Sequence, residues 1–325
     1  MKPVADSGSS PRPSSRTGGA GLANAGQPRP SGGNRLDRHQ TIWGWVFVSP
    51  WIIGFLAFTL IPISLSFYYG FTAYNIYQPP RWIGLANYQT LIEDPLFWTA
   101  LWNTVYYTFI SVPLILALSL GIALLLNSRL PGMGLFRTIY FLPSVLSGVG
   151  VALLWMWVFN PDFGLINSML ELVGIRGPLW LFSPEWSKPA LIIMSLWGLG
   201  GVMVINLAGL QSIPGALYDA AKIDGAGPLA QLRYVTLPML SPTLFFNFIT
   251  LTIGSLQIFT QAYVMTQGGP INSTLFYVFY LFNLAFENLR MGYASAMAWI
   301  LFIIIVAFSI FQMRMSGRWV YYEEA

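Results

Sequence analysis

Four polar residues and one glycine of a single apolar stretch have a spacing that suits hydrogen-bond chemistry. They are Asn247, Thr250, Gly254, Gln257 and Gln261, which follow one another at intervals of three, four, three and four residues. On a helix these intervals place all five along one stripe. Amide groups are costly in lipid unless they are paired. The stripe therefore either lines a path for solute and offers hydrogen bonds to hydroxyl groups, or bonds to neighbouring helices and fixes their packing.

Groups for covalent or metal chemistry are almost missing from the sequence. There are no cysteines, which excludes disulfides, thiolate metal sites and cysteine nucleophiles. The single histidine, His39, lies in a polar stretch, so we expect no histidine-based metal site or catalytic triad. The phosphate-binding pattern Gly-x-x-x-x-Gly-Lys-[Ser/Thr] does not occur. We expect no catalytic residue, metal or cofactor in this chain, and no ATP hydrolysis by it.

The composition is that of a protein embedded in a lipid bilayer. Of the 325 residues, 55% are hydrophobic and only 9% are charged, whereas soluble domains carry roughly a quarter charged residues. The net charge of +4 is small and dispersed, which argues against nucleic acid as a partner. Residues 1–40 are rich in Gly, Pro, Ser and Arg and predict a disordered cytoplasmic tail, followed by a transmembrane domain over residues 41–325.

The elements that must position the stripe are membrane-spanning helices. About six apolar stretches are long enough to cross a hydrocarbon core of roughly 30 Å. The predicted fold is therefore an all-α, polytopic membrane protein with six transmembrane helices. We place these spans near residues 42–70, 101–127, 139–159, 189–212, 239–264 and 294–313.

The distribution of basic residues predicts the orientation. Among the loops on one side, only Arg81, Arg176, Lys188 and Arg290 are basic, while most Lys and Arg residues lie in the tail, the second and fourth loops and the C-terminus. The positive-inside rule then places both termini in the cytoplasm. No ionisable residue falls inside a predicted span, which argues against an ion-coupled secondary carrier.

The fourth connection, residues 214–238, lies on the cytoplasmic side in this topology, and we call it the coupling segment. Its pattern predicts a short helix over residues 215–223, ended by Gly225 in a left-handed conformation with Asp224 in the turn. Gly227-Pro228 then opens a second short helix over residues 229–235, and Pro238 marks the start of the fifth span. Such a pair of helices either docks in a cleft of another protein or is an ordinary connector.

The sequence of this segment resembles a known motif. Pro-Gly-Ala-Leu-Tyr-Asp-Ala-Ala-Lys-Ile-Asp-Gly-Ala-Gly-Pro over residues 214–228, with Val-Thr-Leu-Pro at 235–238, resembles the EAA loop of ABC importer permeases. It is most similar to the carbohydrate-uptake branch, with its maltose, lactose and glycerol-3-phosphate permeases. Asp219 stands where that motif usually has Glu. Tyr-Phe-Leu-Pro at 140–143 and Gln-Gly-Gly-Pro at 267–270 extend the resemblance, which covers residue 40 to the C-terminus.

The resemblance implies a role in transport rather than an enzymatic one. It implies a permease subunit of an ATP-driven importer in the cytoplasmic (inner) membrane of a prokaryote, which moves a sugar or related polyol by alternating access. The implied partners are a second homologous permease, a dimer of ATP-binding subunits and an extracellular or periplasmic solute-binding protein. The residues implied to contact the ATP-binding subunit are Asp219, Ala220, Ala221, Asp224, Gly225, Ala226 and Arg233.

Two alternatives stay open at this point. One is an ion-coupled secondary carrier. The other is an ABC permease for a non-sugar solute, such as glycerol-3-phosphate or a peptide.

Overall fold

The computed structural model describes residues 34–128 and 130–321, and the chain divides into two compact units, Met1–Ile61 and Pro62–Ala325. The first unit contributes helix α1 (Asn34–Phe55), which runs through the π-turn η1 (Leu56–Leu60) into α2 (Ile61–Tyr69). Most of the predicted 1–40 tail lies outside the described residues, but α1 already begins at Asn34. The stretch His39–Tyr69 is apolar enough to span a membrane, and none of its most apolar window is buried.

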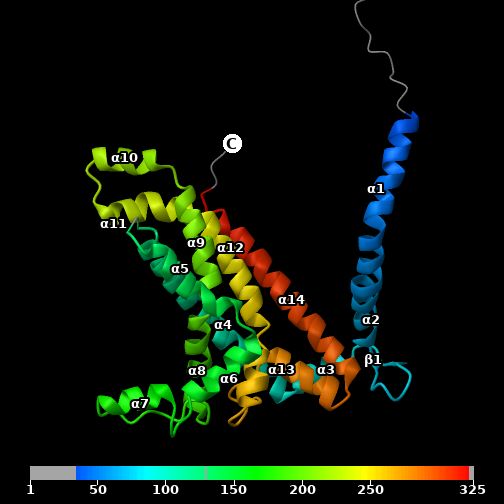
Figure 1. Cartoon of the computed structure of the whole chain (residues 1–325). Helices are drawn as coiled ribbons and strands as arrows, with labels where there is room; N and C mark the ends of the chain where they lie inside the picture. Colours follow the sequence, from blue (N-terminus) through cyan, green and yellow to red (C-terminus); the bar gives the residue numbers. More distant parts are fainter. Residues whose placement is uncertain (1–33, 129, 322–325) are drawn as a thin grey trace, which may run out of the picture. The chain divides into compact units, whose positions relative to one another are not determined.

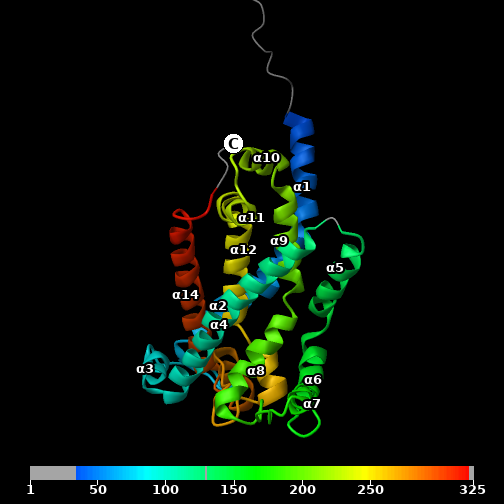
Figure 2. The same ribbon diagram turned by 90° about the vertical axis from the view of Figure 1, so that its left-hand side faces the viewer.

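The second unit is a bundle of helices (Figures 1 and 2). A short antiparallel pair, β1 (Thr72–Ala73) and β2 (Arg81–Trp82), places Thr72 opposite Trp82. The helices of its first part are α3 (Ala86–Glu93), α4 (Pro95–Leu126), α5 (Met133–Phe141), η2 (Leu142–Val145), α6 (Gly148–Val158), α7 (Leu165–Leu172), α8 (Pro184–Trp197) and α9 (Gly200–Ser212). Those of its second part are α10 (Gly215–Ile223), α11 (Pro228–Gln231), η3 (Leu232–Thr236), α12 (Leu237–Leu256), η4 (Ala262–Thr266), α13 (Tyr277–Phe282), η5 (Asn283–Glu287) and α14 (Met291–Ser316).

The predicted all-α polytopic fold is confirmed, but two spans are bent. Within the described residues, four helices are long and apolar enough to cross a membrane, or up to six if each bent pair counts as one span. The pair Met133–Val145 and Gly148–Val158 bends by 101°, and the pair Pro184–Trp197 and Gly200–Ser212 by 46°. The third span, predicted near 139–159, is therefore a bent pair of helices that begins earlier, at Met133. Pro143 cannot donate a helical hydrogen bond, and the helix breaks shortly after it.

Helix α4 is the centre of the bundle and packs against α8, α9 and α12. The Asp94 carboxylate caps it by accepting a hydrogen bond of 2.9 Å from the Leu96 N–H, and Pro95 occupies the first turn. Gly200 allows α9 to approach α5 closely, because a Cβ there would lie 2.3 Å from the Tyr140 carbonyl oxygen. These contacts fix α4, α9 and α12 as the walls of the site described below.

The helices extend past the predicted span boundaries and take in basic residues. Arg137, Lys188, Arg233 and Arg314 all lie on helices that form candidate spans, but outside the span bounds predicted from the sequence. Lys188 is half-buried, and its Nζ donates to Asn103 Oδ1 at 2.9 Å. Long basic side chains are tolerated near helix ends because their charged groups reach polar partners or water.

Candidate functional site

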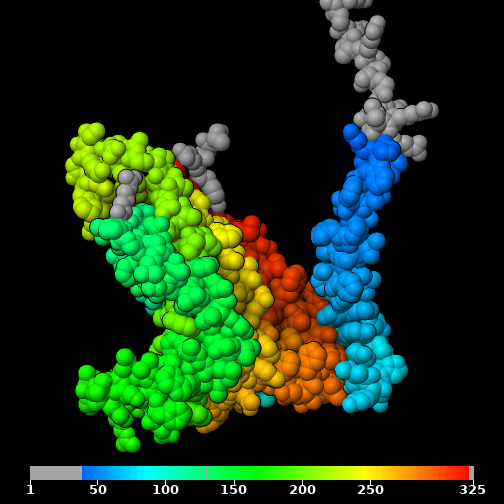
Figure 3. Space-filling model, viewed as in Figure 1, coloured from blue at the N-terminus to red at the C-terminus, as the bar shows by residue number. Residues whose placement is uncertain are grey.

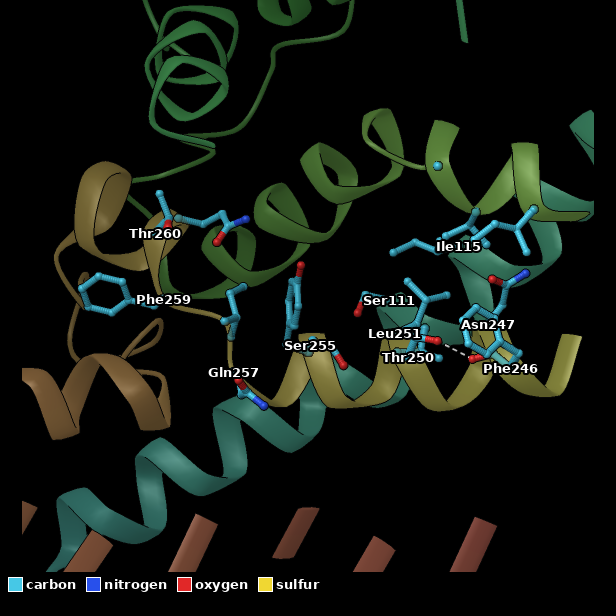
Figure 4. A pocket seen from close by; sticks show the side chains of 18 residues that line it. Ser111, Ile115, Phe246, Asn247, Thr250, Leu251, Ser255, Gln257, Phe259 and Thr260 are labelled. Atoms are coloured by element: carbon cyan, nitrogen blue, oxygen red, sulfur yellow. Dashed lines mark hydrogen bonds between the residues drawn. The ribbon is translucent and has the colours of Figure 1, made fainter. Parts of the chain in front are cut away.

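A cavity of about 580 Å³ lies between α4, α9 and the fifth span (Figure 4). All five residues of the predicted stripe line it, Asn247, Thr250, Gly254, Gln257 and Gln261. The opposite walls come from Tyr107, Ser111 and Ile115 of α4 and from Gly201, Val202 and Ile205 of α9. The fold therefore brings the stripe to a cavity.

The stripe does not lie on one continuous helix, and this prediction was wrong. Helix α12 ends at Leu256, and Gln257 is its C-cap with φ −106° and ψ 19°. The chain is irregular from Gln257 to Phe259, and Gln261 lies on the next helical turn as the N-cap residue of η4. The break turns Ile258 into the core, where it is 6% exposed, so burial of this side chain outweighs the local preference for a longer helix.

Asn247 is a packing residue as well as part of the cavity wall. Its side chain is 2% exposed, and Nδ2 donates to Asn206 Oδ1 at 2.8 Å. Asn206 Nδ2 in turn donates to Ser119 Oγ at 3.1 Å. This chain of hydrogen bonds joins α12, α9 and α4, as the packing alternative required.

The other amides of the stripe have no such partners. Gln257 is exposed and Gln261 half-buried, and neither side chain forms a hydrogen bond among the described residues. Thr250 is exposed, and its hydroxyl donates to the Phe246 carbonyl. Gln257 and Gln261 therefore line the cavity with amide groups that no described residue binds, whereas the Asn247 amide donates within the protein.

Sequence reasoning did not single out Ser111, which faces the cavity from α4. The residue is fully buried, and its hydroxyl has no hydrogen-bond partner among the described residues. Tyr107, Ser111 and Ile115 recur at intervals of four residues, which is the signal for one helix face. No lining residue of the cavity carries a charge.

The coupling segment is exposed at one end of the second unit (Figure 3). Helix α10 ends as predicted, with Gly225 at φ +80° and the Ala226 N–H donating to the Ala221 carbonyl at 2.9 Å. Lys222 Nζ lies 3.1 Å from Asp219 Oδ1 on the helix surface. Asp219, Ala220, Asp224, Gly225 and Arg233 are exposed, while Ala221 and Ala226 are half-buried.

Large apolar side chains accompany these polar residues. Ile223 is 87% exposed and Leu229 is 77% exposed. Apolar side chains gathered on a small exposed segment are typical of a protein–protein contact.

The predicted second short helix is not a separate element. Helical structure continues without a break from Pro228 to Leu256 through α11, η3 and α12, so Pro238 lies in the first turn of α12 rather than at the start of the span. Proline is tolerated in that position because the π-turn Leu232–Thr236 precedes it. Tyr218 Oη lies 3.0 Å from Thr236 Oγ1, and Gln231 Nε2 donates to the Ala226 carbonyl at 2.8 Å. These bonds attach α10 to the helix that lines the cavity.

Known proteins are similar to this chain in both fold and sequence. The family described as binding-protein-dependent transport system inner membrane component matches residues 95–320. This chain belongs to that family. The match begins at Pro95, the first residue of α4, and includes the cavity and the coupling segment.

Two curated relatives and one solved structure are similar to this permease. The probable ABC transporter permease protein YesP of Bacillus subtilis (strain 168) is 41% identical over 295 residues, which are 89% of this chain and 95% of YesP. The lactose transport system permease protein LacF of Rhizobium radiobacter is 38% identical over 285 residues, 85% of this chain and 95% of LacF. A crystal structure of a bacterial ABC transporter involved in the import of the acidic polysaccharide alginate superposes with a TM-score of 0.77 at 26% identity, covering 87% of this chain and 98% of that one.

The permease is thus an inner membrane component of an ABC importer and a transport subunit rather than an enzyme.

At the opposite end of the unit from the coupling segment, residues 266–277 of the permease form what we call the outer cap. Asn103 Nδ2 donates to the carbonyl oxygens of Asn272 at 2.8 Å and Leu275 at 3.1 Å, while Asn103 Oδ1 accepts from Lys188. The Tyr277 N–H donates to Thr104 Oγ1 at 2.9 Å. The outer cap is therefore tied to α4 by hydrogen bonds, and Lys188 of α8 holds the Asn103 side chain that makes two of them.

Asp94 adds further hydrogen bonds at the end of the bundle that carries the outer cap. Its Oδ2 accepts hydrogen bonds from Tyr280 Oη at 2.6 Å and from Tyr293 Oη at 2.8 Å. Burial by itself raises the pKa of the Asp94 carboxyl, but the bonds from the two tyrosines and from the Leu96 and Phe97 N–H groups outweigh it and hold the pKa below its ordinary value. Burial, followed by the bond to Asp94, raises the pKa of the Tyr280 hydroxyl.

Proposed function

We propose that this permease forms half of the translocation path of an ATP-driven importer for a neutral saccharide or polyol. The observation that carries the proposal is the helix Pro228–Leu256, which begins at the coupling segment and whose far half lines the cavity. Because a hydrogen-bonded helix moves as a stiff body, a displacement of α10 reaches the cavity through α11 and α12. A pull on the exposed segment thereby changes the shape of the cavity.

The coupling segment supplies the contact with the ATP-binding subunit in this proposal. Alanines at 220, 221 and 226 permit close approach of a partner's backbone, and the carboxylates of Asp219 and Asp224 and the guanidinium of Arg233 form ion pairs around them. Exposed Ile223 and Leu229 supply the apolar part of the contact. Gly225 sets the angle between α10 and the following helix.

The lining of the cavity supports a neutral solute. Gln257 and Gln261 offer donors and acceptors to hydroxyl groups, Thr250 and Ser111 add hydroxyls, and Tyr107 presents a flat ring to a sugar face. Glycerol-3-phosphate or a peptide would bring charged groups, and the lining has no charged residue to pair with them. The relative LacF is named for lactose, a neutral disaccharide, and this supports the same class of solute.

The proposed partners follow from the family to which the chain belongs. We propose a second homologous permease that closes the path, a dimer of ATP-binding subunits under the coupling segments, and an extracellular or periplasmic solute-binding protein at the opposite face. The transported molecule passes by alternating access, and the chain works without a cofactor of its own.

The test is uptake by reconstituted vesicles. The permease is inserted into proteoliposomes with a second permease, an ATP-binding subunit and a solute-binding protein from the same organism. The expected result is ATP-dependent uptake of a neutral saccharide from a panel of labelled lactose, maltose, trehalose, galacturonate, glycerol-3-phosphate and a dipeptide. Uptake by the isolated chain under an ion gradient, without the ATP-binding subunit, would overturn the proposal and favour a secondary carrier.

A further inference from the structure

A second cavity, of about 680 Å³, lies at the end of the bundle that carries α10. Its described walls are residues 127, 128 and 130 between α4 and α5, the start of α5, the end of α9 and the start of α10, and Figure 2 shows α5 beginning at this same end. The polar side chains that line it are Asn127, Ser128, Arg137, Gln211 and Tyr218. No part of the transport proposal uses this cavity.

The cavity contains a positive charge that no carboxylate of the described residues neutralises. Arg137 is half-buried, and its Nε and Nη2 donate to the Leu126 carbonyl at 3.3 and 2.8 Å. These bonds hold the guanidinium against the last turn of α4. Arg137 forms no ion pair with any described residue. A partly buried guanidinium is suited to bind a phosphate or carboxylate through its remaining N–H groups.

The start of α5 adds further donors beside Arg137. Gly132, Met133 and Gly134 all line the cavity, and the N-cap residue Gly132 provides no side-chain hydrogen bond to the helix. The first N–H groups of a helix have no partner within it, and the helix dipole favours an anion in front of them. The buried Ser128 hydroxyl, also without a hydrogen-bond partner among the described residues, completes the set.

An exposed apolar surface continues from this cavity along α5. Leu135 is 65% exposed, Phe136 49% and Ile139 54%, and Leu130 at the cavity wall is 62% exposed. A free phosphate ion would use the donors but leave this surface unoccupied. A molecule with a phosphate group and long acyl chains fits both.

We propose that this cavity binds the phosphate headgroup of an anionic phospholipid, with its acyl chains lying along α5. The phosphate is held by Arg137, the first turn of α5 and Ser128. The inference rests on the proposed function only for the membrane orientation, in which this end of the bundle faces the cytoplasm. There, basic pockets between transmembrane helices recruit anionic lipids.

The experiment measures lipid retained by the purified permease. The chain is incorporated into nanodiscs of dioleoyl phosphatidylglycerol and dioleoyl phosphatidylcholine in equal amounts, released into detergent and analysed by native mass spectrometry. The wild type is expected to retain phosphatidylglycerol in preference to phosphatidylcholine. R137Q is expected to lower that preference by about tenfold, because one charge-assisted interaction is lost. R314Q, which removes an arginine outside the cavity at the end of α14, serves as the matched control and should leave the preference unchanged.

Four results would overturn the proposal. The first is an unchanged preference in R137Q, and the second is an equal loss in R137Q and R314Q. The third is displacement of the lipid by millimolar inorganic phosphate, which would assign the site to a soluble anion. The fourth is loss of ATP-binding subunit docking in R137Q with lipid retention intact, which would assign Arg137 to a protein contact.

A measurement on the wild type keeps the test decisive if R137Q does not fold. Hydrogen exchange of the amides at residues 133–136 should be slower in phosphatidylglycerol nanodiscs than in phosphatidylcholine nanodiscs, and equal rates would contradict the proposal. Because both readouts need only the isolated chain, they succeed or fail independently of transport activity.

Discussion

The outer cap and the coupling segment lie at opposite ends of the bundle and are built in opposite ways. The outer cap is held by hydrogen bonds that Asn103 donates and by one that Thr104 accepts, and Phe276 and Tyr277 are fully buried. In α10 of the coupling segment no residue is buried, and the segment is attached to the bundle through bonds such as that between Tyr218 and Thr236.

This difference shows which end of the bundle is rigid and which end is exposed for contact with a partner. Buried hydrogen bonds are expensive to break because the separated groups stay away from water. An exposed helix pays no such cost when it moves with a partner. The outer cap therefore acts as the fixed end of the bundle, and the cavity lies between this end and the movable coupling segment.

The largest expected effect comes from breaking the outer cap. N103A removes the donor to the carbonyl groups of Asn272 and Leu275 and the acceptor of Lys188, and should lower the free energy of unfolding by about 3 kcal/mol. The measurement is unfolding by sodium dodecyl sulfate in mixed micelles. N288A, at an exposed asparagine, is the control and should unfold like the wild type. Equal losses in the two variants would mean that the outer cap is not a rigid anchor.

The next effect concerns the coupling segment. G225P cannot adopt the φ of +80° that the turn requires, so the angle between α10 and α11 is lost. Uptake should fall to near background while ATP hydrolysis continues and the protein stays in the membrane. G227A is the matched control, because Gly227 has φ −70° and no neighbouring atom in the way of a Cβ. Wild-type uptake in G225P would remove the coupling role.

A moderate effect is expected at two amide side chains of the cavity, which differ in whether they bind solute or support the fold. Q257L should leave assembly intact and weaken solute affinity by about fivefold, the value of one hydrogen bond. N247L should instead destabilise the fold, because Asn206 loses its buried partner. The measurements are uptake at several solute concentrations and the unfolding midpoint of each variant. If Q257L lost stability and N247L lost only affinity, the assignment of the two amides would be reversed.

The smallest effect is the pH dependence of the Asp94 cluster. The pKa of Asp94 is lowered in the folded state, so its stabilisation is complete above the ordinary Asp value of about 3.9 and is lost as pH falls through the lower folded value. D94N should lower the melting temperature by about 2–4 °C at pH 7, and the difference from the wild type should disappear toward pH 2. D162N, at an exposed aspartate, should show no difference at either pH. A gap between wild type and D94N that stays constant down to pH 2 would exclude Asp94 as the cause.

Much of the fold was readable because the apolar stretches are long and their turn residues are distinctive. The glycine at 225 and the short helix before it were predictable from local backbone rules alone. The bends in the third and fourth spans were not, because a proline or glycine in an apolar stretch allows a kink but does not set its angle. The bend angle is set by the residues against which the helices pack, such as Tyr140 against Gly200.

The candidate site was likewise predictable in part from the sequence. Spacing found the five residues that line the cavity but assumed a continuous helix, and burial of Ile258 interrupts that helix. Spacing also did not distinguish Asn247, which bonds to Asn206 some forty residues away, from Gln257, which faces the cavity. Ser111 and Arg137 could be recognised as cavity-lining residues only once the packing of the other helices was known.

The sequence by itself determined that the chain spans a membrane, that it lacks groups for covalent chemistry, and that an exposed helix–turn element interrupts its apolar stretches. These properties follow from composition and local backbone preferences. Only the tertiary structure decided which amides are free, that the coupling segment and the cavity share one helix, and that Arg137 lies beside an uncapped helix start. Those outcomes depend on contacts between residues far apart in the chain, and such contacts leave no local signal.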